Sequence, residues 1–356
     1  MSASGWRQRF VRRLWRRRSW KARAARTVLL PVAGVYTAIM SLRTAWYRVG
    51  LGTRRSLPLP AIAVGNLSVG GTGKTPLAAW IAALCVDVGR RPGVLLRGYG
   101  RDEVLVHRRL VPGAIVVANR DRVAGAHTAK AQGATVLVLD DAFQLLDTAR
   151  DLNIAVLAAE QAHLPRWNLP AGPWREGLAA LSRADVLVVT RKRAALEVAQ
   201  ALADRLAARR PRTPVALARL ELTGLVGMRS GTAVPLAALR GQRILAAAGI
   251  ADPESFAVQV RASGATVQLA AYQDHHEYGP TDVDRLVRDA AGAGYLVITE
   301  KDAVKLRSVW PADAPEPLVA VMAWTWERNE LAVVDAIQRV LAGSPRATTN
   351  LTTHHS

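Results

Sequence analysis

The sequence predicts an α/β protein with a doubly wound, mainly parallel sheet and a second, smaller α/β domain. Three observations predict this fold class. A glycine-rich turn separates an apolar run from a helical pattern, a later apolar run ends in two carboxylates, and alternating strand and helix patterns restart after Glu221. With 356 residues, the chain is long enough for two domains with sizeable cores.

The glycine-rich turn begins after Ala61-Ile62-Ala63-Val64, a short apolar run typical of a buried strand, and apolar residues recur at helical spacing from Pro76. Glycines between a strand and a helix let several backbone N–H groups point at a phosphate. Lys74 supplies a charge for the outer phosphates, and the Thr75 hydroxyl can bind Mg²⁺. Ser68 stands where the first glycine of the usual G-x-x-x-x-G-K-[ST] pattern would fall. We therefore predict a phosphate-loop NTPase-like fold with a nucleotide bound by Ser68, Val69, Gly70, Gly71, Thr72, Gly73, Lys74 and Thr75.

A second apolar run, residues 136–139, ends in the carboxylates Asp140 and Asp141. In phosphate-loop enzymes an acid at the end of a neighbouring strand holds Mg²⁺, directly or through water. An aspartate that caps a helix is the alternative interpretation. The order of strand, loop, helix and acid-tipped strand favours the metal, because ligands of doubly wound folds gather at the carboxyl ends of the strands.

A third apolar run, Val94-Leu95-Leu96, is followed by Arg97-Gly98-Tyr99-Gly100-Arg101-Asp102-Glu103. These polar residues are expected to face the same edge of the sheet. Asp102 and Glu103 are candidates for a base that accepts a hydroxyl proton. A surface turn would also use glycine and aspartate, so spacing alone leaves both interpretations open.

The pattern after Glu221 predicts the smaller α/β domain, with the active site in the crevice between the two domains. Glu300, Lys301 and Asp302 follow a strand end and either face this crevice or form an ordinary salt-bridged helix start. The expected strands are residues 243–246, 266–269 and 295–299, and the expected helices are residues 253–262 and 281–291.

The single cysteine, Cys85, cannot form an internal disulfide and fits a small core residue in a reducing compartment. His275 and His276 are ambiguous, because adjacent histidines in a loop are more often solvated than catalytic. A metal site would want further ligands at suitable spacing, and the sequence has no Cys/His cluster that supplies them.

The net charge of +20 is concentrated at the N-terminus, where residues 1–26 carry nine Arg, one Lys and no acid, interleaved with Trp and Phe. Residues 27–42 then have no charge. The basic region is too long for a signal peptide, and the uncharged run is too short for a spanning helix and contains Pro31. A helix lying in an anionic membrane interface fits best. A solvated basic tail and nucleic-acid binding are the alternatives.

Taken together, the motifs resemble the tetraacyldisaccharide 4′-kinase (lipid A 4′-kinase) family. The similarity runs in order from about residue 28 to 340, and the family also has Ser or Thr at the position of Ser68. The motifs that carry it are the loop at 64–76, Arg97-Gly98-Tyr99-Gly100-Arg101, Asp140-Asp141-Ala142-Phe143-Gln144, Leu169-Pro170-Ala171-Gly172-Pro173-Trp174-Arg175-Glu176, Ala248-Gly249-Ile250-Ala251-Asp252-Pro253, Asp274-His275-His276-Glu277-Tyr278 and Thr299-Glu300-Lys301-Asp302-Ala303-Val304-Lys305-Leu306.

The resemblance implies transfer of the γ-phosphate of ATP, with Mg²⁺, to the 4′-hydroxyl of an acylated glucosamine disaccharide 1-phosphate lipid. It also implies a peripheral protein at the cytoplasmic face of the bacterial inner membrane, with no nucleic-acid partner expected. Asp102 matches the catalytic acid that accepts the hydroxyl proton, His275 its partner, and Lys74 the group that stabilises the transferring phosphoryl. Thr75 with Asp140 or Asp141 would organise the metal, and the substrate-binding positions match Glu103, Gln144, Arg175 and Glu176.

Two departures from the family pattern stand out. The family usually has a longer insert before the catalytic acid, whereas Asp102-Glu103 follows Arg101 at once and Val104 replaces a proline. After Gln144 the family commonly has His-Arg-Arg, where this chain has Leu145-Leu146-Asp147. The first departure bears on the assignment of Asp102, and the second on substrate affinity or specificity.

The implied organisation is a basic arm (1–26), an interfacial membrane-associated helix (27–56), a phosphate-loop kinase domain (57–222), a smaller α/β domain (223–345) and a disordered tail (346–356). A phosphate-loop GTPase or metallochaperone is an alternative, but residues 190–193, Thr-Arg-Lys-Arg, do not supply the Asn-Lys-x-Asp that reads guanine. A membrane-bound nucleotide-binding protein with weakened catalysis is the other alternative.

Overall fold

The computed structural model describes Trp15 and residues 19–98, 101–164 and 166–343. Most of the basic arm, Tyr99 and Gly100, and the polar tail with His354 and His355 lie outside these residues. The helices and strands are α2 (Trp20–Arg48), β1 (Ala61–Asn66), α3 (Lys74–Asp87), β2 (Pro92–Leu96), α4 (Arg101–Leu110), β3 (Ile115–Ala118), α5 (Arg122–Ala131), β4 (Val136–Leu139), β5 (Leu152–Ala158), η1 (Ala159–Gln161), η2 (Leu178–Arg183), β6 (Val186–Arg191), α6 (Leu196–Arg209), β7 (Val215–Gly227), β8 (Ala233–Val234), η3 (Leu236–Leu239), β9 (Arg243–Ala248), α7 (Pro253–Ala262), β10 (Thr266–Ala271), α8 (Pro280–Ala290), β11 (Tyr295–Ile298), α9 (Glu300–Leu306), β12 (Leu318–Arg328) and α10 (Glu330–Leu341).

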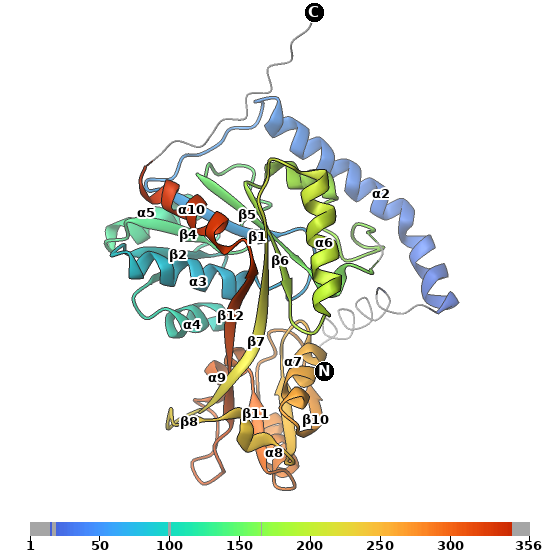
Figure 1. Cartoon of the computed structure of the whole chain (residues 1–356), viewed down its shortest axis with the longest axis vertical. Coiled ribbons are helices and arrows are strands. Elements are labelled where there is room, and N and C mark those ends of the chain that lie inside the picture. The colour runs from blue at the N-terminus through green and yellow to red at the C-terminus, as the bar shows by residue number, and fades with distance from the viewer. Residues whose placement is uncertain (1–14, 16–18, 99–100, 165, 344–356) are drawn as a thin grey trace, which may run out of the picture.

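Twelve strands of the described chain form one sheet, in the order β10-β9-β11-β12-β7-β6-β5-β1-β4-β2-β3, with β8 beside β7. The pairs β7–β12 and β7–β8 are antiparallel and the others are parallel, which confirms the mainly parallel α/β class. The long strands β7 and β12 run from a larger lobe, which carries β1–β6, into a smaller lobe, which carries β8–β11 (Figure 1).

The central strands β1, β4 and β5 are buried along their whole lengths, which explains why they are continuous apolar runs in the sequence. The acid-tipped strand β4 pairs directly with β1, so Asp140 and Asp141 emerge beside the glycine-rich loop that follows β1. The helix predicted at 253–262 has these bounds, and the other predicted elements of the smaller lobe are shifted by one or two residues at an end.

The core of the larger lobe packs α3 against the parallel strands. Helix α10 belongs to the same core, since Val333, Ile337 and Val340 are buried there together with Leu77 and Ile81 of α3. Although α10 falls within residues 223–345 in the sequence, the antiparallel β12 returns the chain to the larger lobe before this helix begins (Figure 1). The smaller lobe has its own buried clusters on the two faces of its sheet.

The N-terminal helix differs from the prediction in its bounds and at its proline. It spans Trp20–Arg48 rather than residues 27–56, because the preceding Ala- and Arg-rich residues 20–26 also form helix and Gly50, with φ of 82°, follows its C-terminal end. Pro31 lies inside the helix and does not end it. By length and composition alone, the stretch Arg23–Arg48 could cross a membrane, so the argument from Pro31 and the short uncharged run was wrong.

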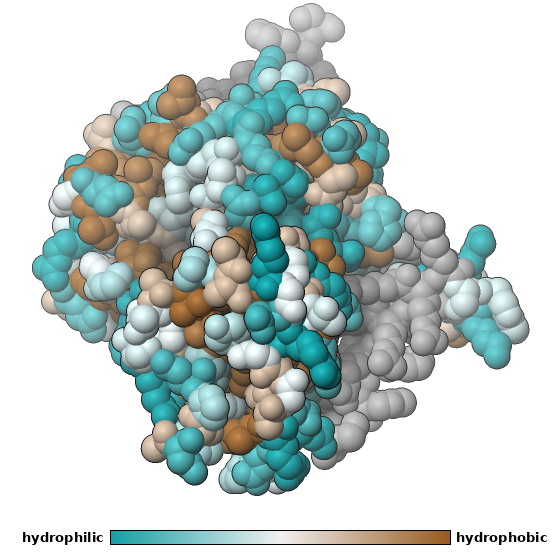
Figure 2. Space-filling model, turned by 60° about the horizontal axis from the view of Figure 1, so that its bottom comes forward, coloured by the Kyte–Doolittle hydropathy of each residue, from teal (hydrophilic) through white to brown (hydrophobic). Residues whose placement is uncertain are grey.

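One face of α2 packs on the body of the protein and the other is exposed. Ala33 is buried, the Thr37 hydroxyl accepts a hydrogen bond from Asn168 Nδ2 (2.9 Å), and Arg43 Nη1 donates to the carbonyl of Gln144 (3.2 Å). The exposed face carries a stripe of large apolar residues at alternating spacings of four and three: Val28, Val32, Val35, Ile39, Leu42 and Trp46, which are 54–76% exposed. Elsewhere, the smaller lobe viewed from below shows a mixed surface of hydrophilic and hydrophobic residues (Figure 2).

Candidate active site

The glycine-rich loop lies between the C-terminal end of β1 and the N-terminal end of α3. Gly70 and Gly73 have φ angles of 128° and 90°, a region that side chains rarely adopt, which is why the sequence places glycine at both positions. Thr72 is buried and fixes the loop from both sides: its hydroxyl accepts a hydrogen bond from Asn66 Nδ2 (2.8 Å), and its carbonyl accepts one from the Thr190 hydroxyl (2.7 Å). The loop is therefore held in shape by side chains at the ends of β1 and β6.

The loop forms one wall of a cleft of about 780 Å³ whose other walls come from both lobes. This volume lies in the range of small-molecule and cofactor sites. The predicted loop residues that line it are Val69, Gly70, Gly71, Thr72, Gly73, Lys74 and Thr75. Ser68 instead lines a neighbouring pocket, and its hydroxyl donates to Gln161 Oε1.

The carboxylate of Asp140 lies beside Thr75 as predicted for a magnesium site. Its Oδ2 accepts hydrogen bonds from the Thr75 hydroxyl (3.0 Å) and from His107 Nε2 (3.1 Å). Its Oδ1 is buried and has no hydrogen-bond partner among the described residues. Burial raises the pKa of Asp140, but His107 and Lys74 outweigh this effect and lower it. An ionised carboxylate with an unpartnered oxygen beside a threonine hydroxyl fits Mg²⁺, which takes few protein ligands and completes its shell with water and phosphate oxygens.

Asp141 faces the cationic side of the site. Its carboxylate lies 3.4 Å from Lys74 Nζ and accepts two hydrogen bonds from Arg175 Nη1 (3.1 and 3.2 Å). Burial raises the pKa of Asp141, but the charges of Lys74 and Arg175 outweigh this and lower it. Asp141 therefore positions Lys74 and Arg175, while Asp140 is the member of the pair with an oxygen left for a metal.

The structure brings Asp102 and His275 together from the two lobes. Asp102 lies in the first turn of α4, and His275 lies in a loop of the smaller lobe, 173 residues away in sequence. His275 Nδ1 is 3.0 Å from Asp102 Oδ2, and Lys305 Nζ of α9 is 3.1 Å from the same oxygen. The Asp102 and Lys305 side chains are nearly buried (2% and 7% exposed), whereas His275 is 40% exposed and lines the cleft. The predicted pairing is thus present despite the shortened loop before Asp102.

The electrostatics of this cluster keep Asp102 ionised. Burial raises the pKa of Asp102, but the hydrogen bond and charge of His275 and the charge of Lys305 outweigh burial and hold it well below its usual range. The hydrogen bond to Asp102 in turn raises the pKa of His275. Next to this pair, burial raises the pKa of Glu103, whose carboxylate lines the cleft 3.9 Å from Lys301 Nζ.

The remaining predicted substrate residues are divided between two places. Arg175 lines the cleft, and its Nη1 donates a hydrogen bond to Gln144 Oε1 (3.4 Å). Gln144 Nε2 in turn donates to the carbonyl of Asn66 (2.6 Å). Glu176 is buried in an ion pair with Arg183 (2.8 Å) and is not among the described residues that line the cleft. Of the residues after β11, Glu300 and Lys301 line the cleft, whereas Asp302 is buried against Tyr278 and Thr299.

Three site residues were missed in the sequence. Lys305 follows Lys301 by one helical turn, which was an available signal that both face the same side. Lys192 directly follows β6, so the strand-end rule could have placed it at the cleft; its Nζ donates to the carbonyl of Gly71 (2.9 Å) and burial lowers its pKa. His107, which is buried against Asp140, gives no signal in the sequence.

Comparisons with known proteins agree on one family. The family model described as tetraacyldisaccharide-1-P 4′-kinase matches residues 25–108 and 102–342, two segments that overlap at residues 102–108. A tetraacyldisaccharide 4′-kinase of Pelobacter propionicus is 36% identical over 346 residues, covering 90% of this chain and 92% of the relative. One of Geobacter sulfurreducens is 37% identical over 310 residues, covering 80% and 85%.

A solved structure also matches this chain over most of the length of both proteins. It is the crystal structure of LpxK from Aquifex aeolicus in complex with ATP, which superposes with a TM-score of 0.69 at 28% identity and covers 89% of this chain and 99% of that one. The similarity therefore includes both lobes rather than the phosphate-loop lobe alone.

Proposed function

Because the chain belongs to the tetraacyldisaccharide 4′-kinase family, it is an ATP-dependent kinase of lipid A biosynthesis, and we propose a division of roles among the residues of its cleft. The reaction joins the 4′-oxygen of the acylated disaccharide 1-phosphate to the γ-phosphorus of ATP, breaks the bond to the β,γ-bridging oxygen and releases ADP and a proton. The protein must hold the phosphates, stabilise the charge of the transferring group and take up that proton.

The phosphate loop holds the phosphates of ATP. The loop, ordered through Thr72, lines the cleft with its glycines, and Lys74 would supply charge to the transferring phosphoryl group. Thr75 and Asp140 would hold Mg²⁺, which when bound neutralises charge on the phosphate oxygens. Lys192, which lies against the outside of the loop at Gly71, adds a second cation at this end of the cleft.

The Asp102–His275 pair takes up the hydroxyl proton, and this contact is the observation that carries the proposal. Asp102 provides the negative charge, and His275, the exposed member, fixes the orientation of the carboxylate through its Nδ1. Arg175, held by Asp141 and adjacent to Gln144, is placed to bind an anionic group of the lipid, because a guanidinium forms paired hydrogen bonds with phosphate. Glu103, which lines the cleft near His275 and Lys301, would contribute a polar contact to the sugar.

A transfer assay tests these roles. Radiolabelled ATP and tetraacyldisaccharide 1-phosphate are incubated in detergent with the wild type and with Asp102→Asn. We expect phosphate transfer by the wild type and a kcat lower by about 10²–10⁴-fold in the variant, the usual contribution of a positioned base. Asp282→Asn is the matched control, since Asp282 pairs with His276 (2.9 Å) in the smaller lobe away from the cleft lining.

Each outcome has a distinct meaning. Normal turnover by Asp102→Asn would show that the Asp102–His275 pair does not take up the proton. It would also refute the alignment of Asp102 with the catalytic acid of the family across the shortened loop. Binding of ATP by the wild type with no transfer would instead show a protein with weakened catalysis, the alternative that the sequence left open.

Peripheral binding to the cytoplasmic face of the inner membrane is the second part of the proposal. The exposed apolar stripe of α2 suits burial in a lipid interface, and the packing of its other face on the body, through Ala33 and Thr37, favours a helix that lies along the surface. Val35→Glu with Ile39→Glu should lower co-sedimentation with anionic vesicles. The control Val258→Glu, at an exposed valine of α7, should not; equal binding by both variants would reject the role of α2.

A further inference from the structure

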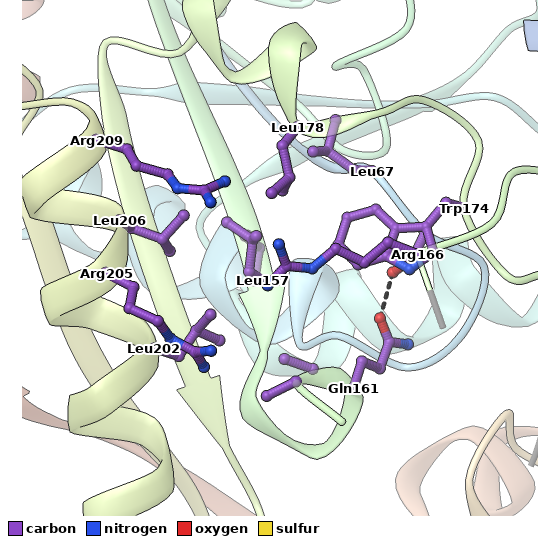
Figure 3. A pocket seen from close by; sticks show the side chains of 14 residues that line it. Leu67, Leu157, Gln161, Arg166, Trp174, Leu178, Leu202, Arg205, Leu206 and Arg209 are labelled. Carbon is purple, nitrogen blue, oxygen red and sulfur yellow. Dashed lines mark hydrogen bonds between the residues drawn. The ribbon is translucent and has the colours of Figure 1, made fainter. Parts of the chain in front are cut away.

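A second pocket lies on the other side of the phosphate loop from the cleft. It has a volume of about 110 Å³ and lies between α6, the end of β5 with η1, and the segment that leads to η2 (Figure 3). Its floor is apolar and is formed by Leu157, Leu178, Leu202 and Leu206. Trp174 lines the pocket while its neighbour Arg175 lines the cleft, so the two sites share a wall without sharing their space.

Three arginines surround this apolar floor. Arg205 and Arg209 come from the last turns of α6 and Arg166 from the opposite segment, and their guanidinium groups converge on the space in front of Leu157 (Figure 3). No Asp or Glu is among the described residues that line the pocket, and none of the three arginines has an ion pair within the described part of the chain. The three arginines are exposed to solvent, and an anion bound between them could accept hydrogen bonds from more than one guanidinium.

A further donor in the pocket also has no acceptor. The indole Nε1–H of Trp174 is buried, at 6% exposure of the residue, and makes no hydrogen bond within the described chain. A buried N–H without a partner costs free energy, and the atom itself has almost no surface that a ligand in the pocket could reach. The donors that the pocket offers above its hydrocarbon floor are therefore the three guanidinium groups.

The segment that carries Arg166 also contacts the N-terminal helix. Asn168 donates a hydrogen bond to the Thr37 hydroxyl of α2, and the Trp15 indole donates one to the carbonyl of Pro170 (3.0 Å). Trp167, which lies between Arg166 and Asn168 in the sequence, is 49% exposed. Asn168, which contacts the helix that we place at the lipid surface, is thus only two residues from Arg166, which lines the pocket.

We propose that this pocket binds the headgroup phosphate of an anionic phospholipid, with the adjoining glycerol and first methylenes on the leucine floor. The inference rests on the proposed membrane association, since α2 would bring the rim of the pocket to the lipid surface. Arginine suits the phosphate because its planar fork donates in pairs, and the apolar floor favours a lipid over a free anion. Gln161, which lines the pocket and accepts from Ser68, places the bound lipid beside the phosphate loop.

Calorimetric titration of the full-length chain in a non-ionic detergent tests the proposal. The probes are dihexanoylphosphatidylglycerol, dihexanoylphosphatidylcholine and inorganic phosphate. The wild type should bind the first more tightly than the other two. Arg205→Gln with Arg209→Gln should weaken that binding by about tenfold or more, because two charge-assisted contacts are lost. The matched control, Arg210→Gln with Arg212→Gln, removes the same charge just beyond α6 and outside the pocket lining, and should bind like the wild type.

Several results would overturn the proposal. Equal binding of the zwitterionic lipid would remove the role of the anionic headgroup, and equal binding of inorganic phosphate would make the pocket a simple anion site. Unchanged binding in the Arg205/Arg209 variant would place the lipid elsewhere. Kinase activity of that variant in the same detergent verifies its fold. Val35→Glu with Ile39→Glu should keep the binding of the short-chain lipid, so a failure of α2 as a membrane helix is distinguishable from a failure of the pocket.

Discussion

Replacing Lys305 by methionine is expected to damage both the stability and the pH profile of this kinase. Methionine keeps most of the length and apolar volume of the lysine stem but removes the ammonium that lies 3.1 Å from Asp102. The carboxylate is then left nearly buried, with His275 as its remaining ion-pair partner among those that the described part of the chain shows. Burial already raises the pKa of Asp102, so loss of Lys305 allows that pKa to rise.

The magnitude follows from the burial of the pair. Both side chains are less than a tenth exposed, and removing one partner of such a pair typically costs about 3–5 kcal/mol, because the other charge stays desolvated. His275 still compensates part of that charge, so the expected loss in the free energy of unfolding is about 3 kcal/mol. Lys301 gives the contrast. Its Nζ lies 3.9 Å from Glu103, both side chains are about a quarter exposed, and such a pair is worth about 0–1 kcal/mol.

Urea unfolding of the wild type, Lys305→Met and Lys301→Met at pH 7.5 measures these differences. The double variant Asp102→Asn with Lys305→Met should recover part of the loss, because no unpaired charge is then buried. In the transfer assay, the acidic limb of kcat against pH should move to higher pH in Lys305→Met as the pKa of Asp102 rises. Equal stability of Lys305→Met and Lys301→Met, with an unmoved acidic limb, would refute the buried ion pair as the support of Asp102.

Three further predictions concern the metal, the histidine and the lipid. Asp140→Asn should raise the Mg²⁺ concentration for half-maximal activity by about tenfold or more, measured by Mg²⁺ titration at saturating ATP, and an unchanged requirement would reject Asp140 as a ligand. The raised pKa of His275 means that its contribution to stability is full below its unfolded value of 6.5 and is lost as pH rises through the folded pKa. The difference in unfolding free energy between the wild type and His275→Asn should therefore shrink from pH 6 to pH 9, and a constant difference would contradict the pairing with Asp102. Arg175→Lys should raise KM for the lipid more than it lowers kcat, since lysine lacks the planar fork; steady-state kinetics that show the reverse would place Arg175 in the chemical step.

The parts of the site that the sequence predicts are those set by local rules. A glycine-rich turn between a strand and a helix places its N–H groups, Lys74 and Thr75 by backbone geometry, and an acid after a neighbouring parallel strand must emerge at the same edge of the sheet. Repeated strand and helix patterns also placed the predicted elements of the smaller lobe to within one or two residues. The bounds of α2 were less predictable, because a proline that only removes one hydrogen bond does not end a helix supported by packing on one face.

Side chains that meet across the two lobes follow no local rule. Asp102 and His275 were paired through the family resemblance, and their separation of 173 residues hides the contact from any periodicity. Lys305 was missed because its partner is fixed by how α9 packs against α4, which depends on the long antiparallel strands that join the lobes. Glu176 shows the converse: it adjoins Arg175 in sequence, yet Arg183 holds it in a buried pair away from the cleft lining.

The placement of the site residues on two lobes affects how Asp102, the proposed base, is kept ionised. The phosphate loop and its acids belong to the larger lobe, whereas His275 and Lys305, the two groups that lower the pKa of Asp102, belong to the smaller one. The phosphate loop is therefore ordered by residues of one lobe, but the charge state of the proposed base depends on contacts between lobes. Substitutions in the paired strands β7 and β12 at positions outside the cleft lining, if they shift α9 relative to α4, should alter the pH dependence of kcat before they alter ATP affinity. They change the distance between Lys305 and Asp102 and leave the residues of the phosphate loop in place.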